Sequence, residues 1–275
     1  FEHNTENGSV DGTPKQDHAY DVVTEGDLAY LADGGNGLTV YDLTKDPSDL
    51  QSGFLVSNLG GSAQGKAELG RSTGIALWYH PTLPKRYAFL AAGPRGVGVV
   101  DVSDPAAPEL VKVFEPIKIE DGKVGHADGR AVDVQVAGAL AYFTYDSFGI
   151  VCYEVADLIE ALPPDVDPTK IWKVQGGVVL FDYRPEAVGR FKLQTVPGYA
   201  DVDGGALNFI QRQDAGGLLF HVAYGTAGVA TILWTEPGMP LLLDLLDTPG
   251  EAASVEEADG RLFVADSAGG LVYFE

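Results

Sequence analysis

The chain is poor in cysteine, histidine and basic residues, and each shortage excludes a class of protein. A single cysteine, Cys152, cannot form an internal disulfide. The five histidines show no zinc-ligand spacing, and no P-loop, dinucleotide-binding turn, haem-attachment motif or serine-nucleophile elbow is present. The 18 Lys and Arg against 40 Asp and Glu leave a net charge of −22. That balance argues against binding to nucleic acid or to anionic lipid.

Long hydrophobic runs and a leader are missing as well. No apolar run is long enough to span a membrane, so we expect no membrane insertion. No signal peptide is recognisable, which fits either a mature exported protein or a cytosolic one. The strong acidic charge would keep an exported protein soluble.

What the chain does have is one strand-like motif written six times, each copy directly after a glycine. A copy consists of β-forming residues, and most copies end in an acidic residue. The copies are 38–42, 97–101, 150–154, 178–182, 229–233 and 271–275. Repetition of one strand unit predicts a modular all-β fold, most simply a β-propeller.

The residues around each motif complete a four-stranded unit. In five copies an aromatic-type residue lies seven positions before the glycine, as Tyr30 lies before Gly37, which predicts a hairpin. A strand is expected before each hairpin, at 19–22, 74–77, 131–134, 199–202 and 252–255. A fourth strand is expected after it, at 54–56, 110–114, 190–193 and 241–243. Each unit thus has four antiparallel strands and recurs after about 40 to 60 residues, which is typical of a propeller blade.

We therefore predict a single all-β domain over 1–275, a β-propeller with five clear four-stranded antiparallel blades. The copy at 178–182 lacks its upstream half, so it is either a sixth, degenerate blade or a hairpin added within an insertion at 156–177. One short rim helix is expected at 156–162, ended by Pro163-Pro164. The last motif has no fourth strand. Either the stretch 1–16 supplies it and closes the ring, or the chain continues.

The motif series resembles the LVIVD-repeat family. The resemblance is carried by Leu38-Thr39-Val40-Tyr41-Asp42, by the Ala29-Tyr30-Leu31-Ala32-Asp33 before it, and by Ser103-Asp104-Pro105 after the second copy. It is strongest over 19–50, 71–115 and 126–155. The family consists of bacterial and archaeal surface or secreted β-propellers, so the resemblance implies a propeller with an extracellular, cell-surface or periplasmic location. It implies no reaction and no catalytic residues.

One group of residues on the expected channel-mouth face would suit an enzyme. His126, Arg130 and Tyr145 from one blade, with Tyr224 from another, would supply a base, a carboxylate clamp and an acid. Such a set fits β-elimination of a uronate polysaccharide. The alternative is that His126 and Arg130 belong to a solvated loop and to blade packing.

Other polar residues on the same face are candidates for ligand binding. They are His18, Asp21, Arg71, Arg95, Asp133 and Asp201. Asp21, Asp133 and Asp201 are assigned to one repeat position, and acids around a channel axis can bind Ca²⁺. The other interpretation is that each Asp caps backbone N–H groups of a neighbouring loop. The motif-ending acids, such as Asp42 and Asp101, are interpreted as turn formers.

Aromatic residues on the opposite face are a second lead. Trp78 and Tyr79 lie in an expected long loop at 78–86, where aromatics either anchor a sugar or protein contact or fold back over the blade. Cys152 lies in a motif strand and is interpreted as a buried, inert thiol.

The leading interpretation is a non-enzymatic interaction or scaffold module that binds a protein or docks on a surface assembly. It requires no cofactor. A polysaccharide lyase-like enzyme is the alternative, and a calcium-dependent, lactonase-like hydrolase is the second alternative. The channel mouth and the breaks in the repeat, at 78–86, 156–177 and 204–217, are where we expect specific function.

Overall fold

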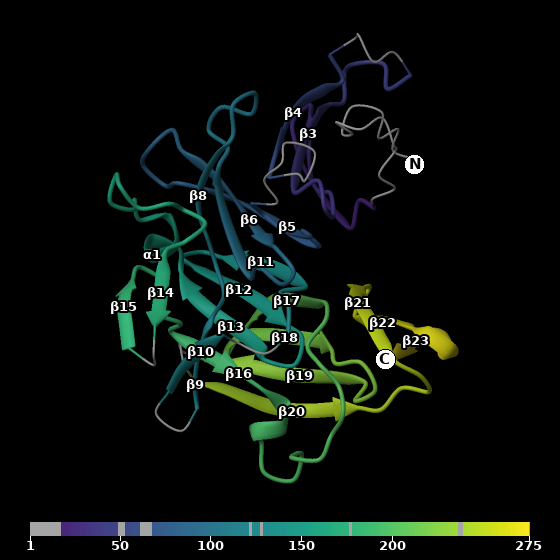
Figure 1. The fold of residues 1–275 in the computed structure, drawn as a ribbon. Coiled ribbons are helices and arrows are strands. Elements are labelled where there is room, and N and C mark those ends of the chain that lie inside the picture. Colours follow the sequence, from purple (N-terminus) through teal and green to yellow (C-terminus); the bar gives the residue numbers. More distant parts are fainter. Residues whose placement is uncertain are drawn as a thin grey trace. The chain divides into compact units, whose positions relative to one another are not determined.

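The computed structural model describes residues 18–48, 53–60, 68–120, 123–126, 129–175, 178–235 and 239–274. The predicted fold class is confirmed, since the strands form the five blades of an all-β propeller fold (Figure 1). Within the described residues, four blades have four antiparallel strands and the fifth has three. The chain divides into two compact units, 1–126 with 156–185 and 127–155 with 186–275.

The first unit contains blades one and two. Blade one consists of β1 (Asp21–Glu25), β2 (Leu28–Ala32), β3 (Leu38–Asp42) and β4 (Leu55–Leu59). Blade two consists of β5 (Gly74–Tyr79), β6 (Arg86–Ala91), β7 (Val97–Asp101) and β8 (Glu109–Phe114). The unit also holds two separate hairpins, β9 (Ile117–Glu120) with β10 (Lys123–His126) and β14 (Trp172–Gln175) with β15 (Val178–Asp182).

The second unit contains blades three, four and five. Blade three consists of β11 (Asp133–Ala137), β12 (Leu140–Tyr145), β13 (Gly149–Glu154) and β16 (Gly189–Phe191). Blade four consists of β17 (Phe209–Asp214), β18 (Gly217–Ala223), β19 (Val229–Trp234) and β20 (Pro240–Leu246). Blade five consists of β21 (Ala252–Ala258), β22 (Arg261–Asp266) and β23 (Gly270–Phe274). In every blade the described strands pair in sequence order.

The seven-residue spacing corresponds to a tight hairpin between the second and third strands, as predicted. In blade one the Asp33 N–H donates to the Gly37 carbonyl at 2.8 Å, and the Gly37 N–H donates to the Gly34 carbonyl at 3.1 Å. In blade two the Ala92 N–H donates to the Gly96 carbonyl at 2.7 Å. The repeat is therefore built by local turn geometry, which the sequence encodes directly.

In blades one to four the glycine before the motif meets two demands at once. Gly96 has φ +83° and Gly228 has φ +84°, a region that L-residues rarely adopt. A Cβ added at Gly96 would lie 2.3 Å from the Phe114 carbonyl oxygen, and one at Gly228 would lie 2.1 Å from that of Leu246. Both oxygens belong to the fourth strand of the same blade. Glycine is required there because the fourth strand passes where a side chain would begin.

The core lies between neighbouring blades of each unit. Between blades one and two, alternate strand residues such as Tyr30, Val40 and Leu90 are fully buried. Between blades three and four, Tyr142 packs against Phe220 and Trp234 with ring centroids 4.8 and 5.2 Å apart. Burying side chains of this size stabilises the fold by roughly 1.5–3 kcal/mol each. Propeller stability therefore depends on pairing of adjacent blades.

The motif copy at 178–182 forms a hairpin and not a blade, which decides between the two interpretations left open by the sequence. Residues 178–182 form β15 and pair with β14 in a sheet of two strands. The hairpin lies in the insertion between β13 and β16 of blade three. The insertion begins with α1 (Val155–Ile159), the one α-helix in the described part of the chain, where the rim helix was predicted.

The strand predicted at 199–202 is wrong. Blade four begins instead with β17, which pairs with β18 through a two-residue turn at Ala215-Gly216. A tight hairpin places the first strand directly before the second, so residues 199–202 lie in the preceding loop. The β9–β10 hairpin was not predicted, and the expected closing strand at 1–16 lies outside the described residues.

No helix in the described ranges is both long and apolar enough to cross a membrane.

Candidate functional site

Asp21 and Asp133 occupy the same position in their blades, and the side chain of each bonds to the next blade of its unit. The Asp21 carboxylate accepts a hydrogen bond from the Ile75 N–H of blade two at 2.9 Å. The Asp133 carboxylate accepts from the Phe209 N–H of blade four at 3.3 Å and from the Asn208 side-chain amide at 2.8 Å. These two acids therefore cap backbone N–H groups of a neighbouring blade, as the structural interpretation of the sequence predicted.

Asn208, and not Asp201, is the member of this repeat position in blade four. The Asn208 side-chain oxygen accepts from the Val255 N–H and from the Ser254 hydroxyl of blade five, both at 3.0 Å. Asp201 is exposed in the loop before β17. Blade two has Gly74 at the position, which offers no side-chain acceptor. Among the described residues, no group of three or more His, Cys, Asp or Glu is placed to hold a metal ion.

Paired backbone bridges accompany the side-chain contacts at the same junctions. Gly34 exchanges two hydrogen bonds with Ser72, at 3.0 and 2.9 Å, between blades one and two. Gly225 exchanges two with Ala252, at 3.1 and 2.9 Å, between blades four and five. Two of the predicted binding residues, Asp21 and Asp133, thus help to hold neighbouring blades together, beside these backbone bridges.

The motif-ending acids are turn formers, as interpreted from the sequence. One Asp42 carboxylate oxygen accepts from the Thr44 N–H at 2.9 Å and from the Thr44 hydroxyl at 2.6 Å. Asp101 accepts from the Ser103 N–H at 2.9 Å. These bonds lower the pKa of Asp42, and at Asp101, where burial opposes them, the bonds from Lys85 and Ser103 still leave the pKa lowered.

The residues of the lyase hypothesis lie in different environments. His126 ends β10, and its side chain is outside the described part of the structure. Arg130 is 61% exposed, with its Nε 3.9 Å from an Asp146 carboxylate oxygen. Tyr145 and Tyr224 are fully buried. The enzymatic hypotheses stay predictions.

Tyr224 has a structural partner. Its hydroxyl oxygen accepts a hydrogen bond from the Leu193 N–H at 3.2 Å. Burial raises the pKa of Tyr224 to about 12, so the phenol is neutral at physiological pH. Its surroundings are those of a core residue.

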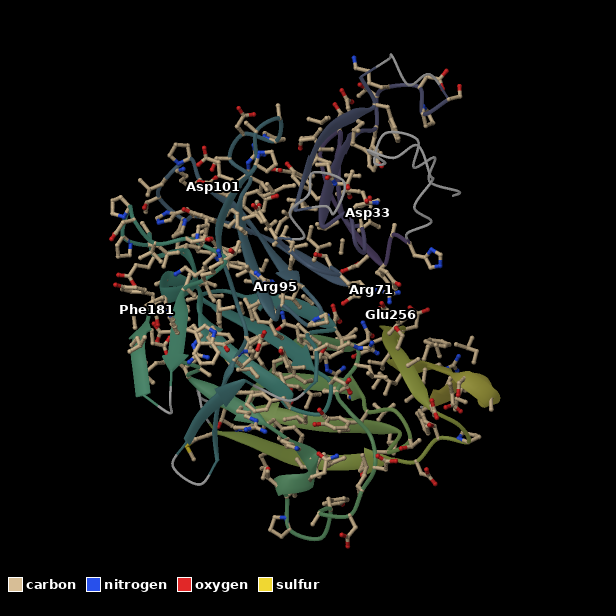
Figure 2. All side chains as sticks on the ribbon, viewed as in Figure 1. Asp33, Arg71, Arg95, Asp101, Phe181 and Glu256 are labelled. Atoms are coloured by element: carbon tan, nitrogen blue, oxygen red, sulfur yellow. The ribbon has the colours of Figure 1, made fainter. Side chains whose placement is uncertain are left out.

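Several predicted binding residues lie near one another on the first unit. The Arg71 guanidinium lies over the exposed Tyr20 ring at 4.9 Å, and the His18 ring is 6.3 Å from that of Tyr20. Arg71 is exposed, whereas Arg95 is half-buried and donates to the Thr169 carbonyl at 3.4 Å (Figure 2). Arg95 therefore contacts the insertion through Thr169, whereas the Arg71–Tyr20 pair lies at the surface.

Trp78 and Tyr79 behave differently although they are adjacent. Strand β5 extends through both residues, so the loop is shorter than expected. Trp78 is half-buried and packs against His80 and Tyr87, with ring centroids 5.6 and 6.2 Å apart. Tyr79 is 49% exposed. The Trp78 side chain thus folds back over the blade, and of the two aromatic side chains only that of Tyr79 is exposed at the surface.

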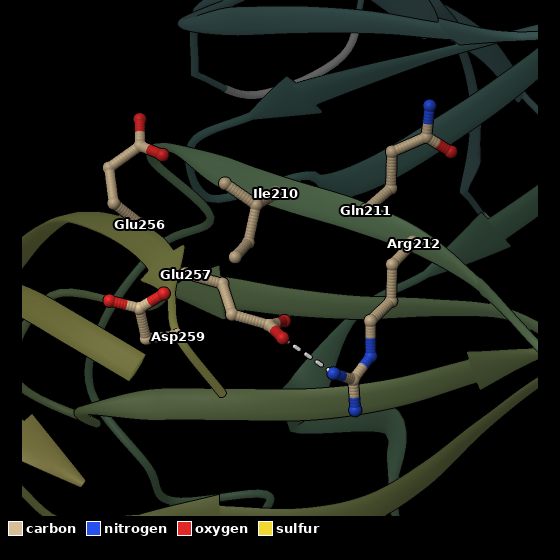
Figure 3. Close-up of a pocket in the computed structure, with 6 residues that line it drawn as sticks. All are labelled: Ile210, Gln211, Arg212, Glu256, Glu257 and Asp259. Carbon is tan, nitrogen blue, oxygen red and sulfur yellow. Dashed lines mark hydrogen bonds and ion pairs between the residues drawn. The ribbon is translucent and has the colours of Figure 1, made fainter. Parts of the chain in front are cut away.

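A shallow groove lies between β17 and the end of β21 in the second unit. It has a volume of about 320 Å³ and is lined by Ile210, Gln211, Arg212, Glu256, Glu257 and Asp259 (Figure 3). Arg212 forms an ion pair with Glu257 at 2.6 Å. The groove is mainly charged, and the ion pair occupies its one basic residue.

An exposed apolar surface lies on the β14–β15 hairpin. Large apolar side chains are exposed at Val179 (41%), Leu180 (52%), Phe181 (37%) and Tyr183 (43%). Figure 2 labels Phe181 on this hairpin. We call these four residues the hairpin surface. From the sequence, 178–182 was either a sixth, degenerate blade or a hairpin added within an insertion, and the exposure of its side chains was not predicted.

The base of the hairpin is fixed by a buried arginine. Arg184 lies over the Trp172 ring at 3.6 Å and forms two hydrogen bonds to the Asp182 carboxylate, at 2.9 and 2.7 Å. The Arg184 side chain is fully buried. A paired guanidinium that is also stacked on an aromatic ring holds one geometry.

Blade two anchors the rest of the insertion. Lys112 of β8 is buried and its ammonium group donates to the Asp157 carbonyl at 3.0 Å. The Val113 N–H donates to the Pro168 carbonyl at 2.9 Å. Burial lowers the pKa of Lys112. The insertion thus covers an edge strand that would otherwise be open.

Comparison with known proteins confirms the resemblance stated from the sequence. The model of the LVIVD repeat matches residues 17–58 and 85–115, so the chain carries LVIVD repeats in blades one and two. No curated protein sequence matches the chain.

Solved structures similar to the chain support the propeller fold. The β-propeller domain of Cps50 (Swd1) from Myceliophteria thermophila is 12% identical with a TM-score of 0.52, over 96% of this chain and 73% of that one. The WD40 β-propeller domain of Doa1 is 11% identical with a TM-score of 0.51, over 94% and 63%. BBS1N, in complex with ARL6DN, is 10% identical with a TM-score of 0.52, over 95% and 66%. At such identities the likeness shows the fold alone.

Proposed function

We propose that the protein is a non-enzymatic interaction module that binds another protein through the hairpin surface. The exposed apolar side chains of β15 carry this proposal. Soluble proteins rarely leave neighbouring large apolar residues uncovered unless they serve an interaction. The insertion is additional to the four strands of blade three, so its presence calls for a role other than completing the blade.

Two further observations support a binding role. Asp21, Asp133 and Asn208 are engaged in hydrogen bonds between blades, and Tyr145 and Tyr224 are buried. One similar structure, BBS1N with ARL6DN, was solved as a protein complex. We also propose that the protein works outside the cytoplasm, at the cell surface or in the periplasm. The net charge of −22 and the LVIVD repeats support that location.

Site-specific photo-crosslinking tests the proposal. A photoreactive phenylalanine analogue replaces Phe181, and the purified protein is exposed to an extract of the native cells. A matched control carries the analogue at Leu43, which is 51% exposed on blade one. We expect one polypeptide adduct of defined mass from position 181 and none from position 43. Excess unlabelled protein should abolish the adduct, and excess Phe181→Ser protein should not. The absence of a position-specific adduct would overturn the proposal.

A further inference from the structure

We propose that the junction between blades four and five is a pH-sensitive contact, in which protonation of His221 weakens the packing of blade five on blade four. The proposal is independent of binding at the hairpin surface, because the residues that carry it belong to blades four and five of the second unit.

A histidine stands at this junction where blades one to three have a buried aromatic residue. The residue seven positions before the motif glycine is Tyr30, Phe89 or Tyr142 in those blades, and each is buried. In blade four it is His221, which is half-buried and pairs with Thr231 of β19, its Nδ1 lying 3.1 Å from the Thr231 hydroxyl oxygen. The junction thus contains a group that can gain a charge in mildly acidic solution.

The His221 side chain lies on the face of blade four that packs against blade five. Residues two apart in a strand share a face, and Ala223 of β18 belongs to the core cluster that blade four forms with blade five. His221 is also directly opposite Ile210 of β17, which packs against the same cluster. A charge on the histidine ring therefore falls between the two blades.

An ion pair beside His221 joins the same two blades. Arg212 lies on β17, diagonal to His221 across the strand pair, and its guanidinium is 2.6 Å from the Glu257 carboxylate of β21 (Figure 3). Because Arg212 already neutralises Glu257, this carboxylate has little attraction left for an imidazolium. Burial lowers the pKa of His221, the Arg212 charge lowers it further, and Glu257 opposes both without reversing them.

The other charged groups on the strands around His221 are exposed or engaged elsewhere. Exposed to solvent are Asp214, Asp244, Glu256 and Asp259. Asp266 of β22 is buried and accepts hydrogen bonds from the loop before β21, and Arg261 lies over the Tyr273 ring on the opposite face of blade five. The Arg212–Glu257 pair is therefore the charge that acts on the histidine ring.

Blade five is held by smaller side chains than those at the preceding junction. Its buried cluster with blade four consists of alanine, valine and leucine, whereas Tyr142, Phe220 and Trp234 fill the space between blades three and four. An element with little buried apolar contact opens at a low free-energy cost. A change of charge at this junction should therefore alter the opening of blade five measurably.

The direction of the pH effect follows from the lowered pKa. A group whose pKa is lower in the folded than in the unfolded state stabilises the fold above its unfolded pKa, and this contribution is lost as the pH falls through the folded pKa. The ordinary value for histidine is 6.5. The junction should thus be complete at neutral pH and weaken progressively as the pH falls below 6.5.

Hydrogen exchange of the full chain, corrected for the intrinsic pH dependence of amide exchange, tests the proposal. From about pH 7.5 to about pH 5, exchange in β21–β23 should accelerate several-fold more than exchange in β11–β13 of blade three. His221→Gln should abolish this difference. The matched control His18→Gln, at an exposed histidine of the first unit, should leave it unchanged.

Arg212→Gln distinguishes titration of His221 from a packing role. Without Arg212 the Glu257 carboxylate attracts the imidazolium, so the pKa of His221 should rise and the acid-dependent opening should shrink or reverse. Mere loss of packing would instead speed exchange equally at both pH values.

Three results would overturn the proposal. They are an acid response that persists in His221→Gln, an equal response of blades three and five in the wild type, and a midpoint at or above pH 6.5 for the His221 imidazole in an NMR titration. The NMR titration uses the wild-type chain, so it decides the question even if a variant fails to fold.

Discussion

Replacement of Gly228 by alanine should destabilise the second unit much more than the same replacement of Gly270. Both glycines precede a motif strand and both have positive φ, +84° and +72°. A Cβ at Gly228 would lie 2.1 Å from the Leu246 carbonyl oxygen, whereas a Cβ at Gly270 would meet nothing within 4 Å. The two alanine variants should therefore have the same backbone strain, and only the variant at position 228 should have a steric clash as well.

The expected magnitudes follow from that difference. A left-handed backbone costs an alanine roughly 1–2 kcal/mol at either position. At Gly228 the clash adds about 1–3 kcal/mol, typical of overpacking, because the obstacle is backbone that must separate β19 from β20. We expect a loss in the free energy of unfolding of about 2–5 kcal/mol for Gly228→Ala and about 1–2 kcal/mol for Gly270→Ala.

Urea denaturation followed by tryptophan fluorescence measures both losses. Trp234 is suited to the measurement because it is 3% exposed and lies in β19, next to the affected strand. The signals of the other two tryptophans are removed with Trp78→Phe and Trp172→Phe. Equal losses for the two glycine variants, within about 0.5 kcal/mol, would refute the reasoning that the fourth strand dictates glycine.

Three further outcomes are expected. Asp133→Ala should lower the free energy of unfolding by about 2–4 kcal/mol in urea, because it leaves buried donors without an acceptor, and Asp201→Asn should change it by less than about 0.5 kcal/mol; equal effects would contradict the blade-junction role. Hydrogen bonds from the Thr169 hydroxyl and N–H lower the pKa of Asp167 to about 2. A carboxyl with a lowered folded pKa stabilises the fold above its unfolded pKa and loses that contribution as the pH falls to about 2, so acid titration in urea should show a smaller loss for Asp167→Asn than for the wild type over this window; identical acid profiles would contradict this. Burial raises the pKa of Cys152 to about 12, so a thiol reagent at pH 8 should react only after unfolding, and rapid reaction of the native protein would show the thiol to be accessible.

The blades were predictable because their signals are local. A tight turn fixes the distance from Tyr30 to Gly37, and alternation of apolar residues marks the strands beside it. The prediction failed where the sequence carries no such local signal. We predicted the first strand of blade four at 199–202 because the sequence there resembles the first strands of other blades. The two-residue turn at Ala215-Gly216 instead places this strand at 209–214, directly before the turn. The β9–β10 hairpin has no repeat signal and was missed.

The candidate site was less predictable than the fold. The sequence placed Tyr145 and Tyr224 on a face with polar loops, but a residue type does not reveal whether neighbouring blades cover it. Val178–Asp182 matched the motif as well as the true blade strands did. In the structure it pairs with β14 in a two-stranded sheet and not in a blade, and Val179, Leu180 and Phe181 are exposed, which is a property of tertiary packing.

The sequence by itself determined the repeating four-stranded unit, the glycine at each hairpin, the turn-forming acids and the acidic charge. Each depends on residues a few positions apart, where backbone geometry and composition act directly. Only the tertiary structure decided that Asp133 and Asn208 join blades, that Tyr224 is buried, and that Leu180 and Phe181 are exposed. The Asp133 and Asn208 hydrogen bonds join residues 47 to 76 positions apart, and the Tyr224 hydroxyl contacts a residue 31 positions away. Burial and exposure depend on such distant contacts, which residues a few positions apart do not determine.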